Sequence, residues 1–197
     1  MQTKQELDII TRIRGEVMNH KEHTGVNLFL VWGYPTLLVF LMEFAALMLW
    51  NLFLCEWLWV GIPLVGVPLM KYFQRKDYER TGRRTLDEER ALQVWFFVGG
   101  ASCLSGFFTG FTGVYEQCYC TLQGLLLGMG CFLTGVISRF RPMTVCGIIG
   151  AVVSFLLLIL QGDLWPWQLL MLAVITVITL IIPGHLSRHY AKKEYMF

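Results

Sequence analysis

Apolar residues are gathered into six long runs along the chain, and short polar stretches separate these runs. A helix that crosses the hydrocarbon core of a bilayer needs roughly 17–25 mostly apolar residues, and every run has this length. The runs cover residues 27–50, 52–72, 91–114, 121–138, 143–161 and 167–184. The pattern therefore predicts an all-α fold, a polytopic bundle of six transmembrane helices.

Polar segments flank the predicted transmembrane domain, which extends over residues 26–186. In the first segment, 1–25, residues 3–22 begin with a capping box and repeat apolar side chains at helical spacing. We predict a cytoplasmic amphipathic helix there, which lies on the anionic inner leaflet or packs on the bundle or on a partner chain. The last segment, 187–197, is predicted to be a cytoplasmic tail.

Composition agrees with a membrane protein and excludes other classes. Charged residues make up only 15% of the chain, whereas a typical soluble domain has about 25%. The 55% of hydrophobic residues excludes intrinsic disorder. Sixteen Lys and Arg against fourteen Asp and Glu lack the strong basic excess of a nucleic-acid-binding domain. We therefore expect the lipid bilayer, and no nucleic acid, among the partners.

The basic residues are distributed unevenly over the connections between the predicted helices. All 16 Lys and Arg lie in the N-terminal segment, in the stretch 71–90, in the turn 139–141 or in the C-terminal segment. The other three connections contain none. Because Lys and Arg collect on the cytoplasmic side of short loops, we predict that both termini are cytoplasmic.

Glu43 is the only charged residue in the interior of a run. An acid inside the membrane is costly and is a functional hypothesis by default. Thr109, Thr112 and Gln123 are predicted at a similar depth, near the outer ends of their helices. Such a cluster can bind a cation or a proton; alternatively, a protonated Glu43 forms structural hydrogen bonds between helices.

Proline and glycine mark further positions within the runs. Pro35 interrupts the 27–50 helix, and Pro63 and Pro68 interrupt the 52–72 helix. Paired breaks can mark a transporter site, but they can equally be plain kinks. Small residues also recur every four positions, and these motifs predict a tight pairing of the 91–114 and 121–138 helices within one chain. Homo-oligomerisation is the less favoured use of the motifs, which are Ser102-x3-Gly106-x3-Gly110 and Gly124-x3-Gly128.

Histidine and cysteine provide only weak candidates for chemistry. His185 and His189 have the helical spacing of a metal-binding pair, but two ligands do not make a site, and the zinc-protease pattern HExxH is absent. Cys55, Cys118 and Cys120 are predicted on the outer side. An oxidising compartment there would allow a disulfide from Cys55 to Cys118 or Cys120.

Motifs for catalysis are missing from the chain. It contains no phosphate-binding loop, no GxSxG sequence and no acid pair spaced for hydrolysis on one helix. We therefore expect no enzymatic activity, no cofactor and no bound metal. The favoured function is a scaffold, sensor or regulatory partner that binds a protein at the cytoplasmic face. The alternative is a small-solute or ion transporter or channel that uses Glu43 and the two proline-interrupted helices.

Three segments, 29–34, 128–142 and 182–185, resemble sequences of a family of small six-helix inner-membrane proteins of Bacteroidota that has no known activity. The resemblance covers most of the chain. It implies an inner-membrane location, with the outer loops in the periplasm, and a neighbouring winged-helix regulator. It assigns no role to any residue.

Overall fold

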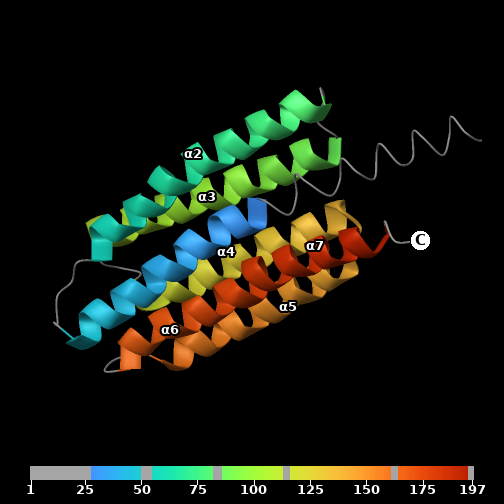
Figure 1. Ribbon diagram of the computed structural model, residues 1–197. Helices are drawn as coiled ribbons and strands as arrows, with labels where there is room; N and C mark the ends of the chain where they lie inside the picture. The colour runs from blue at the N-terminus through green and yellow to red at the C-terminus, as the bar shows by residue number, and fades with distance from the viewer. Residues whose placement is uncertain (1–27, 50–54, 82–85, 113–115, 161–163, 195–197) are drawn as a thin grey trace, which may run out of the picture.

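The computed structural model describes residues 28–49, 55–81, 86–112, 116–160 and 164–194, and it is helical throughout this part, with tight turns and no strand. The helices lie along one another in an elongated bundle (Figure 1). Their bounds are Leu28–Leu49 for the first helix, Cys55–Thr81 for α2, Leu86–Thr112 for α3, Glu116–Ile137 for α4, Arg141–Ser154 for α5, Trp165–Thr176 for α6 and Ile182–Glu194 for α7. A 3₁₀ turn, η1 (Phe155–Ile159), extends α5, and a π-helical turn, η3 (Val177–Ile181), joins α6 to α7.

Five helical segments of the described chain are long and apolar enough to cross a membrane. They are Leu28–Leu49, Glu89–Thr109, Cys118–Ile137, Arg141–Ile159 and Pro166–Tyr190. The sixth predicted crossing corresponds to α2, where the apolar segment found is the shorter Ile62–Phe73. The predicted amphipathic helix at 3–22 and the predicted hairpin turn near 50–54 lie outside the described residues.

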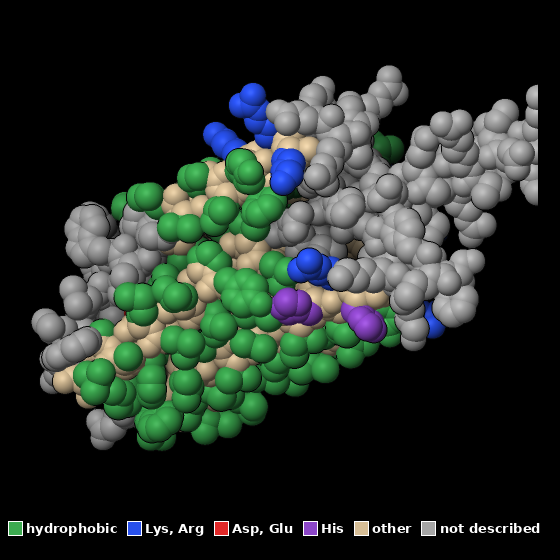
Figure 2. Space-filling view, in the orientation of Figure 1, with side chains coloured by type: hydrophobic (Ala, Val, Ile, Leu, Met, Phe, Trp, Pro, Cys, Tyr) green, Lys and Arg blue, Asp and Glu red, His purple; other side chains and the backbone are tan. Residues whose placement is uncertain are grey.

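Successive helices run in alternating directions, so the bases gather at one end of the bundle. The described Lys and Arg side chains belong to the end of α2, the start of α3, the α4–α5 turn and the later part of α7. All these segments lie toward the right in Figure 1, where the C-terminus also lies. On the face drawn in Figure 2, Lys, Arg and His side chains occupy that end, while the opposite part is almost wholly apolar.

The turn between α4 and α5 is closed by a helix-capping motif. The N–H of Phe140 donates to the oxygen of Gly135, and the N–H of Arg139 donates to that of Val136, which is the hydrogen-bond pattern of a Schellman cap. Arg139 occupies the left-handed position of this cap, with φ of 53°. Pro142 follows in the first turn of α5, where its missing N–H costs no helical hydrogen bond.

The closest helix pair is α4 with α5, which corrects the pairing predicted from the small-residue motifs. A Cβ added at Gly128 would lie 2.6 Å from the backbone nitrogen of Ala151, and one at Gly135 would lie 2.5 Å from that of Thr144. Gly99 and Gly100 on α3 have nothing within 4 Å of an added Cβ. The glycine motif of α4 therefore faces α5. Gly106 of the α3 motif does face α4, where it meets the Tyr119 side chain rather than the backbone of α4.

The last helical segment continues beyond its predicted end at 184. It runs from Trp165 through η3 to Glu194, so much of the predicted tail is helical. The π-helical turn immediately precedes Pro183, which cannot donate a backbone hydrogen bond, and a local widening of this kind accommodates the missing bond. Buried Thr176 and Thr179 donate their hydroxyl protons to the carbonyls of Leu172 and Ile175, respectively.

Prolines do not break the first two helices, which argues against transporter-type breaks and leaves the alternative prediction of plain kinks. The Leu28–Leu49 helix is continuous across Pro35, and α2 is continuous across Pro63 and Pro68. Proline is tolerated in apolar helices because neighbouring groups and small adjustments satisfy the freed carbonyls. The two helices meet where the Trp32 ring covers Gly66, with ring carbon Cζ3 only 2.6 Å from an added Cβ.

Candidate functional site

Glu43 lies on the Leu28–Leu49 helix and is completely buried, with 0% of its surface exposed. Its carboxyl group interacts electrostatically with Tyr119 and Cys120, both on the first turns of α4. Cys120 also packs in an apolar cluster with Phe40 and Leu157. The acid is therefore enclosed between the first helix and α4, at the end of the bundle opposite the bases.

Gln123 lies one turn further along α4 and connects that helix to α3. Its side chain is 4% exposed, and Nε2 donates to Oγ of Ser105 at 2.9 Å and to the carbonyl of Ser102 at 3.3 Å. Gln123 also shares a side-chain hydrogen bond with Tyr119. Hydrogen bonds therefore run from Tyr119 through Gln123 to Ser105, and Glu43 interacts electrostatically with Tyr119 at one end of this chain.

Thr109 is buried on the same part of α3. Its hydroxyl donates to the carbonyl of Ser105 at 2.8 Å. Thr109 is therefore hydrogen-bonded, within α3, to the residue whose side chain accepts from Gln123. Thr112 ends α3, and its side chain lies outside the described part of the chain. Of the four predicted site residues, the structure thus brings Glu43, Gln123 and Thr109 into one region, which we name the Glu43 cluster together with Tyr119 and Ser105.

Tyr119 and Ser105 are absent from the predicted set. The predicted helix begins at residue 121 and so excludes Tyr119, but α4 begins at Glu116, which puts Tyr119 within the first turns of the helix. Its hydroxyl lies against Gly106, where an added Cβ would be 3.1 Å from Oη. The small-residue motif on α3 therefore indicated this contact, although we interpreted it only as backbone packing.

Thr121 adds a second buried polar group to this part of α4. The residue is 5% exposed. Its hydroxyl has no hydrogen-bond partner among the described residues. A buried, unsatisfied hydroxyl costs about 1–3 kcal/mol. The beginning of α4 therefore contains more polar groups than its helix packing uses.

His185 and His189 are both exposed on α7. The Nε2 atom of His185 and the hydroxyl of Tyr34 on the first helix form a hydrogen bond of 2.9 Å. In the part of the chain that is described, no three His, Cys, Asp or Glu side chains are grouped so that they could hold a metal. His185 thus contacts another helix rather than a set of metal ligands.

Cys118 and Cys120 both have free thiols in the structure, with Cys118 exposed and Cys120 buried. The side chain of Cys55 lies outside the described residues, so its disulfide stays a prediction. Because Cys120 is packed in the apolar cluster, Cys118 is the more accessible of the two proposed partners.

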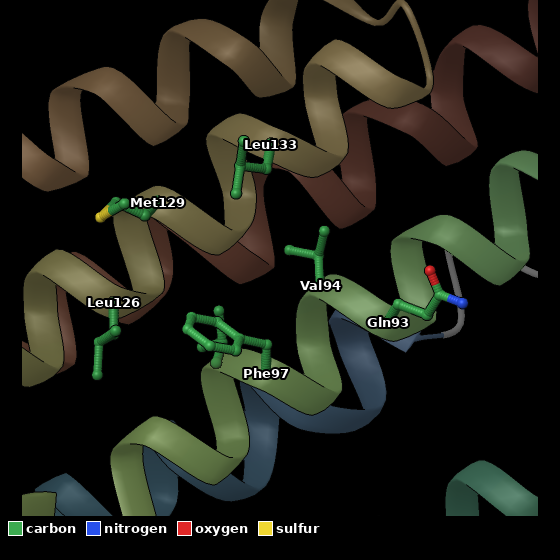
Figure 3. Close-up of a pocket in the computed structure, with 7 residues that line it drawn as sticks. Gln93, Val94, Phe97, Leu126, Met129 and Leu133 are labelled. Carbon is green, nitrogen blue, oxygen red and sulfur yellow. The ribbon is translucent and has the colours of Figure 1, made fainter.

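An apolar groove lies between α3 and α4. It has a volume of about 280 Å³, and Figure 3 shows side chains of both helices facing it. The α3 wall consists of Gln93, Val94, Phe97 and Val98. The α4 wall consists of Leu126, Met129 and Leu133. Trp95 stiffens the helix pair, since its Nε1 donates to Oγ1 of Thr134 at 3.0 Å.

Comparison of the chain with models of protein families, with curated proteins and with solved structures finds no match. The resemblance to the six-helix family of Bacteroidota therefore stays a prediction. The functional interpretation rests on the chain itself.

Proposed function

We propose that the chain is a multi-pass protein of the bacterial inner membrane, with both termini in the cytoplasm, that acts without catalysis as a scaffold, sensor or regulatory partner. The observation that carries this proposal is the collection of Lys and Arg at one end of an otherwise apolar bundle. Bases mark the cytoplasmic side of membrane proteins. That end is also where a soluble protein partner can reach polar and charged side chains.

The use of polar groups inside the bundle supports this assignment. Gln168 on α6 donates to the carbonyls of Leu157 and Leu160, at 3.1 and 2.6 Å, and so closes the end of η1. Trp95 and Gln123 tie α3 to α4. These side chains serve helix-to-helix contacts, which is the usual structural role of polar groups in a membrane bundle.

A crosslinking experiment tests the proposed partner surface. A photo-reactive amino acid replaces Arg188 at the basic end, and a matched variant carries it at Ile159 near the opposite end. We expect a discrete protein adduct from position 188 in intact cells, and its loss when residues 1–22 are deleted. Equal adducts from both positions, or an unchanged adduct after the deletion, would contradict the proposal.

Transport of protons or small cations is the second candidate function. The Glu43 cluster favours it, because an acid at 0% exposure interacts electrostatically with Tyr119, and Tyr119 is linked through Gln123 to a third helix. Acids inside a membrane commonly serve ion pathways and proton relays. The continuity of the first helix and α2 across their prolines removes the other feature that suggested a transporter.

Flux through vesicles tests this second function. The purified protein is reconstituted into liposomes that contain a pH-sensitive dye, and an imposed proton or sodium gradient is followed over time. Transport requires that the wild type dissipates the gradient faster than Glu43→Gln does. Equal rates for the wild type, the variant and empty liposomes would exclude this function and leave the first one standing.

A further inference from the structure

The apolar groove between α3 and α4 has the dimensions of one leaflet of a bilayer. Its α4 wall extends from Leu126 to Leu133, a rise of about 10 Å at 1.5 Å per residue. Half of the hydrocarbon core is roughly 15 Å thick. Val94 follows Arg90 by one helical turn, and Leu133 precedes Arg139 by six residues, so the groove belongs to the half of the bundle that carries the bases.

The volume of the groove indicates which kind of molecule it can hold. A 10 Å length of helix, about 10 Å across, occupies roughly 800 Å³, nearly three times the 280 Å³ of the groove. The groove therefore cannot enclose a second helix. The same volume holds roughly nine groups of about 30 Å³, the space of one water molecule in the liquid and close to that of a methylene. A single acyl chain fits this space.

Charged groups stand where the headgroup of such a lipid would lie. Arg90 is exposed on α3, one turn before the groove, and Arg139 is exposed in the turn that follows α4. Among the described side chains near the mouth, the arginines Arg90, Arg139 and Arg141 outnumber two acids, Asp87 and Glu89, by three to two. Arginine pairs well with phosphate oxygens, and basic pockets between transmembrane helices bind anionic headgroups.

We propose that this groove binds a glycerophospholipid of the base-bearing leaflet, with one acyl chain along Val94, Phe97 and Met129 and the phosphate at Arg90 and Arg139. This inference rests on the proposed membrane location and on no particular activity. The lipid would contact α3 and α4 at the same time and thereby support the attachment of α3 to α4.

Lipid titration followed by native mass spectrometry tests the acyl-chain part. The full-length protein is delipidated in detergent, and phosphatidylglycerol is added as the probe. Val94→Trp fills the groove from α3 and Leu133→Trp fills it from α4. Val145→Trp places the same side chain on the exposed surface of α5 as a control. We expect both groove variants to lose the first bound lipid and the control to keep it. The proposal is overturned if a folded groove variant binds the lipid as well as the control does.

Headgroup recognition is tested with the same measurement. Arg90→Gln should weaken the first binding event about fivefold, the effect of roughly one basic contact, whereas Arg188→Gln on α7 should leave it unchanged. Diacylglycerol, which lacks the phosphate, should bind more weakly than phosphatidylglycerol. Equal binding of the two lipids together with no effect of Arg90→Gln would refute the phosphate site. A wrong membrane orientation would instead appear in topology labelling, so the two failures are distinguishable.

Discussion

Replacement of Gly128 by alanine tests the close packing of α4 against α5. The Cβ of the new side chain would lie 2.6 Å from the nitrogen of Ala151 and 2.9 Å from its Cα. Both atoms belong to the backbone of a neighbouring helix, so no side chain can turn away to make room. Reaching an ordinary contact of at least 3.4 Å requires the two helices to separate by about 0.8 Å at this point.

The expected loss of stability follows from two opposing terms. Overpacking of this kind costs about 1–3 kcal/mol, and alanine recovers up to about 1 kcal/mol of helix propensity relative to glycine. We therefore expect Gly128→Ala to lower the free energy of unfolding by about 1–2 kcal/mol. The matched control is Gly99→Ala on α3, where an added Cβ meets nothing within 4 Å. That substitution should leave stability unchanged or raise it by up to about 1 kcal/mol.

Unfolding by sodium dodecyl sulfate in mixed micelles, followed by circular dichroism, measures both variants under the same conditions. The informative quantity is the difference in the free energy of unfolding between them, which we expect to be about 1–3 kcal/mol. If Gly128→Ala is as stable as Gly99→Ala, the close approach of α4 to α5 is wrong. If Gly99→Ala is destabilised as much as Gly128→Ala, the open surroundings of Gly99 are also wrong.

Three further substitutions test individual contacts. Gln123→Leu removes the hydrogen bonds to Ser105 and Ser102 and should lower the free energy of unfolding by about 0.5–2 kcal/mol. Leu122→Ala at the exposed neighbouring position should lower it less in the same unfolding assay. Equal losses of stability would argue against the hydrogen bonds between Gln123 and α3. Glu43→Gln keeps the shape of the buried side chain and should give wild-type yields of monodisperse protein. Glu43→Lys places a full charge in the bundle at a cost of about 3 kcal/mol and should give less monodisperse protein in size-exclusion chromatography. If both variants elute alike, Glu43 is not enclosed. Arg139→Gly relieves a left-handed conformation and should stabilise the protein by about 0.5–1 kcal/mol relative to Arg139→Ala; a less stable glycine variant would contradict the capping geometry.

Helix positions were predictable because length and apolar content are sufficient to recognise them. Where the prediction departs from the structure, contacts between helices decide the outcome. Pro35 and Pro68 look like breaks in isolation, yet their helices are continuous. Gly128 indicates close packing, but a motif on one helix does not specify its partner. The complementary small residues on α5, Gly147 and Ala151, also lie four positions apart, and this spacing was not recognised as a motif.

The candidate site was predictable only as far as depth in the membrane allows. Glu43, Thr109 and Gln123 were grouped because they lie at similar distances from helix ends, and the structure places them in one region. Depth does not identify which side chains face one another, so Ser105 was missed. Tyr119 was missed because the helix begins before its apolar part. The helix α4 starts at Glu116, five residues before the apolar run that starts at 121.

Cysteine labelling tests most directly the central claim, which is that the chain spans the inner membrane with its basic end in the cytoplasm. One variant keeps only Cys118, which is exposed at the end opposite the bases. A second, otherwise cysteine-free variant carries Arg139→Cys in the α4–α5 turn. A maleimide that cannot cross membranes is added to cells whose outer membrane has been permeabilised. The account predicts labelling of Cys118 in these cells and labelling at position 139 only after the inner membrane is opened; the reverse pattern, or equal labelling of both, would contradict it.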